Sequence, residues 1–181
     1  MCMDLNNCKR CPLYKFRTNV VIGEGAKNSI MLVGEAPGKN EDIVGRPFVG
    51  RAGKILDELL ANVGLKRKDI FITNLVKCRP PNNRDPLEEE IKACSYWLDK
   101  QIIDINPRVI ISLGRFSMRY FQTKFNLPTL PISKVHGIIY NINTLFFKGK
   151  FTAFYHPAVA LYKPAMKIIL KEDWENLMGY L

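Results

Sequence analysis

A glycine-rich segment directly after an apolar run constrains this chain more than any other feature of its sequence. Residues 34–53, GEAPGKNEDIVGRPFVGRAG, contain five glycines and two prolines, and they follow the buried-looking apolar run 30–33. Glycine lets the backbone approach a ligand closely, and proline stiffens a turn. A loop of this kind at the end of a strand is where α/β proteins place ligands. A plain strand-to-helix connection is the alternative, but it would need fewer residues and no aromatic such as Phe48.

The length and net charge of the chain indicate its domain organisation and its class of partner. A chain of 181 residues, of which 47% are hydrophobic, predicts a single domain over residues 1–181. The net charge of +10 suits a polyanion such as nucleic acid, although a basic protein without such a partner could share it. The first residues, MCMDLNNCKRC, lack the apolar stretch of a signal peptide, and no run has the length of a membrane span. We therefore expect an intracellular, cytoplasmic protein.

Five cysteines form the second informative pattern. Cys8 and Cys11 have the C-x2-C spacing that lets two thiolates bind one metal centre, and Cys78 and Cys94 flank a polar segment. An intracellular chain seldom uses such cysteines for disulfides. Four thiolates suit zinc or an iron–sulfur cluster, and the spacing alone does not separate the two. Cys2, close to the start of the chain, is not expected to be a ligand.

Apolar runs alternate with helical patterns along the chain. The expected strands are 20–22, 30–33, 70–74, 109–113 and 151–154, with further extended stretches at 138–140 and 145–147. The expected helices are 52–63, 86–103, 115–121 and 164–181, and 125–135 is expected to be a loop. Asp85 is the expected N-cap of the second helix, with Glu88 as its capping-box partner. Strands separated by helices predict an α/β fold with a parallel sheet covered on both faces.

Two polar residues follow strand ends outside the glycine-rich loop. Asn74 ends the strand expected at 70–74, and His156 follows the strand expected at 151–154 and precedes a proline. Ligands bind beyond the carboxyl ends of parallel strands, which makes both residues site candidates. Each also has a structural explanation, because asparagine can cap a turn and a lone histidine is more often structural than catalytic. His136, the other of the two histidines, is expected at the surface or on the side that faces DNA.

Together these motifs resemble those of the family 4 uracil-DNA glycosylases. The resemblance rests on the 34–53 loop, the NLVKCRPP segment at 74–81, the four cysteines and His156-Pro157-Ala158, and it covers nearly the whole chain. It implies a three-layer α/β/α sandwich around a four-stranded, mainly parallel sheet. It also implies a monofunctional DNA N-glycosylase of bacterial or archaeal base excision repair, associated with the nucleoid. Such an enzyme flips uracil out of DNA and hydrolyses its N-glycosidic bond, leaving an abasic site.

The resemblance also implies roles for single residues. Asn74 is expected to select uracil through its amide, and His156 to donate a hydrogen bond to uracil O2. Glu35 stands where the family has a carboxylate that stabilises the cationic sugar or orients the attacking water. These three are the expected catalytic residues. The expected uracil-binding residues are Gly34, Glu35, Ala36, Phe48, Asn74 and His156. Glu41 is the expected gate against the thymine methyl group, although residues 40–42 could equally form a solvated turn. Leu161 is the expected wedge in the minor groove, and Tyr162 is the next candidate.

The family further implies a [4Fe–4S] cluster with a structural role, because hydrolysis needs no electrons. Its expected ligands are Cys8, Cys11, Cys78 and Cys94. Three basic residues are expected to meet DNA phosphates beside it, namely Lys77, Arg79 and Arg84. The implied partner is uracil-containing DNA, single- or double-stranded, bound by a monomer. A sliding clamp is a candidate repair partner, although the sequence holds no clear clamp-binding motif.

Two other functions compete with this interpretation. The first is a non-catalytic nucleic-acid-binding protein with a structural zinc in the same four thiolates. The second is a mononucleotide hydrolase that uses the 34–53 loop as a phosphate cradle, but the loop lacks the GK[ST] ending of a P-loop. Neither accounts for Phe48, Asn74 and His156 together. The segment 78–94 has no histidine, which favours ordinary hydrolysis over the covalent trapping of one branch of the superfamily.

Overall fold

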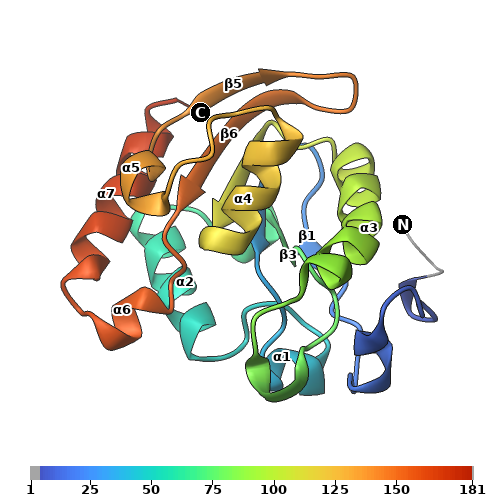
Figure 1. Ribbon diagram of the computed structural model, residues 1–181. Helices are drawn as coiled ribbons and strands as arrows, with labels where there is room; N and C mark the ends of the chain where they lie inside the picture. Colours follow the sequence, from blue (N-terminus) through green and yellow to red (C-terminus); the bar gives the residue numbers. More distant parts are fainter. Residues whose placement is uncertain (1–4, 181) are drawn as a thin grey trace.

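The computed structural model describes residues 5–180, so Cys2 lies outside the described part of the chain. Strands and helices alternate along it (Figure 1). The strands are β1 (Glu24–Gly25), β2 (Ile30–Gly34), β3 (Phe71–Asn74), β4 (Val109–Leu113), β5 (Tyr140–Asn143) and β6 (Lys148–Phe154). The helices are α1 (Lys39–Val44), α2 (Arg51–Asn62), α3 (Glu88–Ile105), α4 (Arg115–Lys124), α5 (Ile132–Val135), α6 (Val159–Tyr162) and α7 (Met166–Met178). Short 3-10 helices are η2 (Pro12–Lys15), η3 (Arg67–Asp69) and η4 (Pro81–Asn83).

The strands form one sheet in the order β1-β3-β2-β4-β6-β5. The central strands β3, β2, β4 and β6 run parallel, and β1 and β5 pair antiparallel at the two edges. The α/β class and the parallel core predicted from the sequence are therefore confirmed. The expected count of four strands is too low, because two short edge strands extend the sheet to six.

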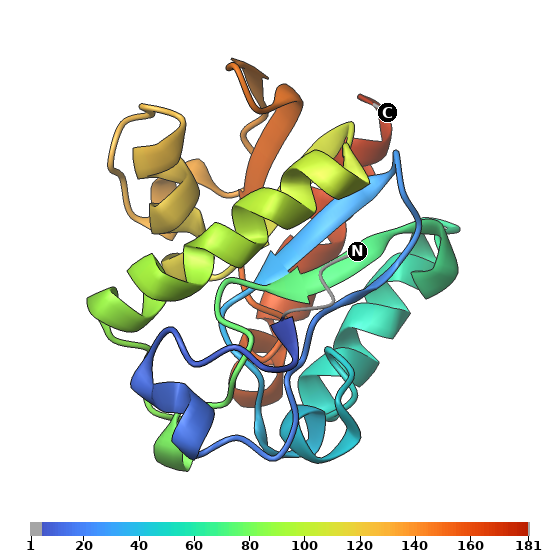
Figure 2. The same ribbon diagram turned by 90° about the vertical axis from the view of Figure 1, so that its right-hand side faces the viewer.

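Alternation along each strand creates two separate cores. Leu32 of β2 packs in one core with Leu56 of α2 and Trp174 of α7. Its neighbour Met31 packs in the other core, which contains Phe121 of α4 and apolar residues of α3. Successive side chains of a strand point to opposite faces, so α2 and α7 cover one face of the sheet and α3 and α4 cover the other (Figures 1 and 2). This is the three-layer sandwich that the resemblance implies. Among residues 5–180, no helix has the length and apolarity to cross a bilayer.

Two predicted extended stretches are not strands of the sheet. Residues 20–22 run beside the end of β3, where the Val21 N–H donates to the Lys77 carbonyl at 2.8 Å, but they form no ladder. Residues 145–147 belong to the turn between β5 and β6, where the Thr144 N–H donates to the Phe147 carbonyl at 2.9 Å. In both places a short apolar run lies in irregular backbone, and Leu145 is fully exposed, so an apolar run alone does not identify a strand.

The start of α3 also differs from its prediction. The helix begins at Glu88 with Leu87 as N-cap, and the Glu90 carboxylate accepts a hydrogen bond from the Leu87 N–H at 2.8 Å. Asp85 is not the cap, because its carboxylate pairs with Arg115 of α4 at 2.5 Å. The predicted loop 125–135 and the extended stretch at 138–140 are corrected too, since α5 occupies 132–135 and β5 begins at Tyr140.

Candidate active site

The carboxyl ends of the parallel strands bring the predicted site residues together. Gly34 ends β2 and Asn74 ends β3, and the two face each other in the β2–β3 ladder. His156 lies two residues beyond the end of β6, where Phe154 pairs with Leu113 of β4. Parallel strands end at one edge of a sheet, so segments far apart in the sequence meet at this edge.

A cavity of about 170 Å³ opens at this edge of the sheet. Its described lining is Ala36, Gly38, Glu41, Phe48, Ala52, Asn74 and His156. The predicted aromatic, amide and imidazole side chains thus share one cavity. It is smaller than the cavities that hold drug-sized ligands, which span about 300–1,000 Å³, and it suits a single small ring.

Gly34 lies directly behind this cavity, where a larger residue does not fit. A Cβ atom on Gly34 would lie 2.3 Å from Asn74 Oδ1 and 2.8 Å from Phe48 Cζ. Asn74 and Phe48 are 2% and 5% exposed, so one of these two packed side chains would have to leave its position to admit the added atom. The glycine therefore permits the close approach of the amide and the aromatic ring.

Phe48 is held in a backbone conformation that bulky residues rarely adopt. Its φ is 52°, in the left-handed region. Arg67 donates from Nη1 to the Pro47 carbonyl at 3.1 Å and from Nη2 to the Phe48 carbonyl. A Cβ atom on Gly53 would lie 1.7 Å from that same Phe48 oxygen. Strained residues of this kind persist where their surroundings over-determine them, and Arg67 and Gly53 supply that support.

The imidazole of His156 is oriented by its own loop. Its Nδ1 accepts a hydrogen bond from the Ala158 N–H at 3.2 Å, which leaves the proton of the neutral ring on Nε2. Burial lowers the pKa of His156 to about 4, so the ring is neutral at physiological pH. The ring stacks on Phe48 with centroids 5.6 Å apart. Gly114, with φ of 94°, permits this position, because a Cβ there would lie 3.2 Å from the His156 Cβ.

Glu41 binds the beginning of the helix that follows the loop. Its Oε1 accepts hydrogen bonds from the N–H groups of Val49 and Gly50 at 2.9 and 2.8 Å, and Gly50 is the N-cap of α2. A carboxylate at a helix N-terminus is stabilised by the free N–H groups and the helix dipole. Glu41 is therefore a fixed part of the cavity wall rather than part of a solvated turn.

Glu35 has a different environment from the other predicted site residues. It is not among the described residues that line the cavity. Burial, with a smaller contribution from the negative charge of Asp85, raises the pKa of Glu35 to about 7, and Arg115 opposes the shift. Asp85 and Arg115 are themselves paired at 2.5 Å. Glu35 therefore titrates near neutral pH beside two charged residues that no sequence pattern connects to the site.

The four cysteines predicted as ligands line one small pocket, to which Lys77 also contributes. Three of their sulfur atoms accept hydrogen bonds from N–H groups. The pairs are Trp97 Nε1 to Cys8 Sγ at 3.2 Å, Arg17 Nη1 to Cys78 Sγ at 3.2 Å and the Lys77 N–H to Cys94 Sγ at 3.3 Å. Burial raises the pKa of Cys94 to about 12, so a thiolate at this position needs a cation beside it. Within residues 5–180, no group of three or more His, Cys, Asp or Glu side chains is arranged to hold a single metal ion.

One of the three predicted phosphate contacts is wrong. The Lys77 side chain is 1% exposed and cannot reach a phosphate, because its ammonium group turns into the protein and donates hydrogen bonds there. Arg84 donates to both oxygens of Glu90, at 2.9 and 2.6 Å, and Arg79 donates from Nε to Asn83 Oδ1 at 2.7 Å. The phosphate contacts of the two arginines remain predictions.

His136 has a more defined environment than the surface position predicted for it. Its Nδ1 lies 3.0 Å from both carboxylate oxygens of Asp173 in α7, and its ring centroid lies 4.9 Å from that of Tyr155. The side chain is 29% exposed. His136 therefore joins the end of β6 to α7, a contact between segments that no local pattern relates.

The predicted wedge lies in the short helix directly after His156. α6 begins at Val159, whose N–H donates to the His156 carbonyl at 2.9 Å. Leu161 is half-buried in this helix, and the next residue, Tyr162, is 78% exposed. The hydrogen bond ties the position of α6 to that of the imidazole.

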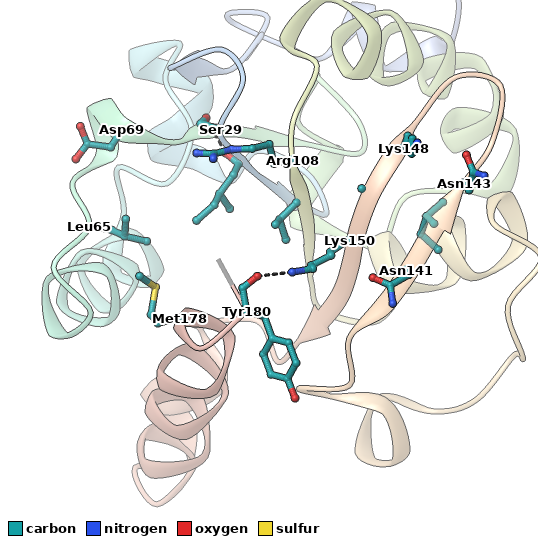
Figure 3. A pocket seen from close by; sticks show the side chains of 14 residues that line it. Ser29, Leu65, Asp69, Arg108, Asn141, Asn143, Lys148, Lys150, Met178 and Tyr180 are labelled. Carbon is teal, nitrogen blue, oxygen red and sulfur yellow. Dashed lines mark hydrogen bonds between the residues drawn. The ribbon is translucent and has the colours of Figure 1, made fainter.

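The larger cavity of about 720 Å³ in Figure 3 lies at the opposite edge of the sheet. It is lined where β2, β4 and β6 begin, by residues that include Ser29, Arg108 and Lys150. Figure 3 shows the Lys150 ammonium directed at the backbone carbonyl of Tyr180, to which it donates a hydrogen bond. None of the predicted site residues is part of the described lining of this cavity. Cavity size therefore does not identify the site in this molecule.

The fold and the site define an α/β protein with a small polar pocket at the carboxyl ends of parallel strands. Comparison with known proteins gives the family. The chain belongs to the uracil-DNA glycosylase superfamily, whose family model matches residues 22–177. The resemblance to the family 4 enzymes is confirmed by the relatives that follow.

Three relatives illustrate the similarity. The type-4 uracil-DNA glycosylase of Saccharolobus solfataricus is 52% identical over 96% of this chain and 82% of its own length. That of Sulfurisphaera tokodaii is 51% identical over 96% of this chain and 80% of its own length. That of Archaeoglobus fulgidus is 45% identical over 96% of this chain and 88% of its own length.

Proposed function

We propose that this protein is a uracil-DNA glycosylase that removes deaminated cytosine from DNA. It flips uracil out of the strand, hydrolyses its N-glycosidic bond and leaves an abasic site for base excision repair. The family of the chain supports this function. The observation that carries the proposal is the meeting of Phe48, Asn74 and His156 around one cavity of about 170 Å³.

Phe48 and Asn74 select the base. The Phe48 ring provides a flat apolar surface for the flipped uracil. The Asn74 carbonyl accepts from uracil N3–H, and its amide NH2 donates to O4. Cytosine has the opposite polarity at both atoms, so the buried amide would lose both hydrogen bonds. Each unsatisfied buried group costs about 1–3 kcal/mol, which favours uracil strongly.

His156 stabilises the leaving group. Negative charge develops on uracil O2 as the glycosidic bond breaks, and a donor placed there lowers the barrier. The neutral imidazole donates from Nε2, since Nδ1 is occupied by the Ala158 N–H. A pKa of about 4 means that the ring acts as a hydrogen-bond donor and does not transfer its proton.

Glu35 acts in its ionised form, on the sugar side of the bond. Its carboxylate stabilises the cationic sugar or orients the attacking water. A pKa of about 7 places this carboxylate close to half-ionised at neutral pH. Glu41, fixed by Val49 and Gly50, excludes the thymine methyl group from the cavity. Leu161 fills the space that the flipped base leaves in the duplex.

The four cysteines hold a [4Fe–4S] cluster in this proposal. Four sulfurs around one pocket, three of them with N–H donors, fit a group of thiolates bound to iron. A group of several iron atoms would not require the four sulfurs to surround a single ion. These four cysteines would join the N-terminal segment to the segment 78–94 through the cluster, and no step of the hydrolysis is assigned to it.

The reaction is simple hydrolysis without strand cleavage. A glycosylase that also cleaves the strand uses an amine nucleophile to form a Schiff base. Among the described residues that line the cavity, none carries an amine. We propose a monofunctional enzyme that works as a monomer and a single domain on single- or double-stranded DNA. A sliding clamp is its candidate repair partner.

An excision assay tests the proposal. The protein is incubated with an end-labelled oligonucleotide that contains one uracil, and abasic sites are then cleaved with alkali. We expect scission only after alkali for the wild type, and a large loss for Asn74→Ala and His156→Ala. Absence of scission on single-stranded, U:A and U:G substrates would overturn the uracil assignment. A DNA-binding protein with a structural metal site would then be the better description.

A further inference from the structure

Lys77 carries a buried ammonium group next to the proposed base-selecting residue. Its side chain is 1% exposed, and it lies three residues after Asn74 and one before Cys78. Lysine is among the residues least often buried, because removing the charge from water costs several kcal/mol per ion. A lysine in this position must therefore be compensated by well-placed hydrogen bonds.

The ammonium group makes three short hydrogen bonds. Nζ donates to Thr73 Oγ1 at 2.7 Å, to the Asn74 backbone carbonyl at 2.6 Å and to Gln101 Oε1 at 2.6 Å. Hydrogen bonds from a charged donor are shorter and about twice as strong as neutral ones. Three acceptors match the three donors of an ammonium group, so its position is well defined.

The acceptors are themselves held from outside the strand. Gln101 comes from α3, and its Nε2 donates to the Ile22 carbonyl at 2.6 Å. Thr73 Oγ1 donates to the same carbonyl at 2.9 Å. Lys77 therefore joins the end of β3 to α3 and to the extended segment 20–22. This polar network holds the end of β3 beyond Phe71 and Ile72, the two residues that pair with β1.

The Asn74 carbonyl is the point where this network meets the candidate active site. Asn74 is the last residue of β3, and its neighbour Leu75 donates to the Gly34 carbonyl at 2.9 Å on the other side. The chain is thus fixed on both sides of the residue whose Oδ1 approaches Gly34. A displacement of about 1 Å in a site of this kind can cost about 10²-fold in rate.

The backbone of Lys77 has a second function in the same place. Its N–H donates to Cys94 Sγ at 3.3 Å, and its carbonyl accepts from the Val21 N–H at 2.8 Å. One residue therefore contacts the cysteine pocket through its backbone and Asn74 through its side chain.

We propose that Lys77 is a positioning residue for Asn74 and thereby sets the preference of the cavity for uracil. This inference rests on the proposed function, in which Asn74 recognises the base. The ammonium group does not touch the base. It fixes the backbone from which the selecting amide projects, and a lysine that looks like a phosphate contact in the sequence becomes a determinant of specificity.

A double-mutant cycle tests this inference. The variants are Lys77→Met, Asn74→Ala and the double variant, with exposed Lys68→Met as a matched control. We expect Lys77→Met to slow single-turnover excision about 10-fold or more, as for loss of a hydrogen bond from a charged donor. We expect no additional loss in the Asn74→Ala background, because coupled residues are not additive. Equal slowing in both backgrounds would overturn the inference.

Free uracil gives a second measurement that a purely structural role would not change. Lys77→Met should weaken inhibition by free uracil about 10-fold, while its affinity for an oligonucleotide with an abasic site stays at the wild-type value. If the methionine variant does not fold, Lys77→Gln, whose amide keeps two N–H donors, takes its place in the cycle. If the wild-type protein excises no uracil, the proposed function itself is wrong. If the wild-type protein excises uracil and free uracil inhibits the Lys77 variant as strongly as the wild type, only the role of Lys77 is wrong.

Discussion

Asn74 Oδ1 lies 2.3 Å from the place where a Cβ atom on Gly34 would stand. The two residues end neighbouring parallel strands, so their proximity is fixed by the β2–β3 register and not by a flexible loop. In the proposed function, the recognition of uracil would thus depend on the absence of a methyl group at residue 34. Mutation, pH and spectroscopy can each test a part of this arrangement.

Gly34→Ala should reduce kcat/KM for uracil excision by about 10²-fold, because Asn74 or Phe48 must move to accept the methyl group. Gly64→Ala is the matched control. Gly64 has φ of 73° and no atom within 4 Å of a built Cβ, so alanine there strains only the backbone. The control should lose about 1–2 kcal/mol of stability and keep its activity. Similar activity losses in both variants would contradict the account of Gly34.

The excision rate should rise with pH and reach half of its plateau near pH 7, because the pKa of Glu35 is about 7 and the ionised form is active. Glu35→Gln should abolish this limb and lower the rate by about 10²–10⁴-fold. His156, with a pKa of about 4, should add no step above pH 5.5 or so. The measurement is single-turnover excision from pH 5 to 9 or so. A pH limb that persists in Glu35→Gln would assign the titration to another group.

Arg115→Met should move this pH midpoint upward. Arg115 is the cation that opposes the rise in the pKa of Glu35, and its removal also leaves Asp85 unpaired nearby. Arg119→Met, on the exposed side of the same helix, is the control and should leave the midpoint unchanged. A pH midpoint that falls in Arg115→Met would contradict the expected sign of the effect. A midpoint that moves equally in both variants would show that Arg115 has no specific effect on Glu35.

Cys94→Ser should remove the visible absorbance of the purified protein and lower its Tm by about 5 °C or more, since metal binding contributes to folding. Cys2→Ser should change neither quantity. Iron and sulfide analysis of the wild type identifies the metal centre. If the wild-type protein is colourless and contains one zinc per chain, the four cysteines hold a structural zinc and not an iron–sulfur cluster.

Leu161→Ala should slow excision from duplex DNA about 10-fold and leave excision from single strands unchanged, because only a duplex loses a stacked base when uracil flips out. Ile168→Ala, an exposed apolar residue of α7 that is 63% accessible, should have no effect on either substrate. Tyr162→Ala is the informative comparison, since Tyr162 is the more exposed of the two neighbours. A duplex-specific loss in Tyr162→Ala alone would move the wedge by one residue.

Local patterns in the sequence were enough to predict the parallel strands at the centre of the sheet. The runs that became β2, β3, β4 and β6 are short and apolar. β2, β3 and β4 are buried throughout, and in β6 the predicted residues 151–154 are buried. The edge strands were harder, because β1 has two residues and β5 alternates buried and exposed positions. The site candidates Asn74 and His156 were visible because both follow such runs, and Phe48 because an aromatic stood out among glycines.

Long-range contacts account for what the sequence did not predict. Lys77 looked like a surface cation, since the acceptor that buries it, Gln101, lies on a helix 24 residues away. Asp85 was predicted to be a helix cap, because the sequence does not show that it pairs with Arg115, 30 residues away. The hydrogen bonds from Arg67 that support Phe48 are also contacts between residues distant in the sequence, and the sequence did not predict them. Spacing along the chain reports helix faces and strand ends, but it does not report which polar groups meet across layers.

The separation of the two cavities has a practical consequence for the search for inhibitors. A compound selected to fill the larger cavity would bind at the amino ends of β2, β4 and β6, in the cavity of Figure 3. From there it would leave the pocket around Asn74 open, at the other end of the same strands. Fragment screens on this enzyme should therefore be scored by competition with uracil and not by occupancy, because the roomier cavity offers binding without a block of repair.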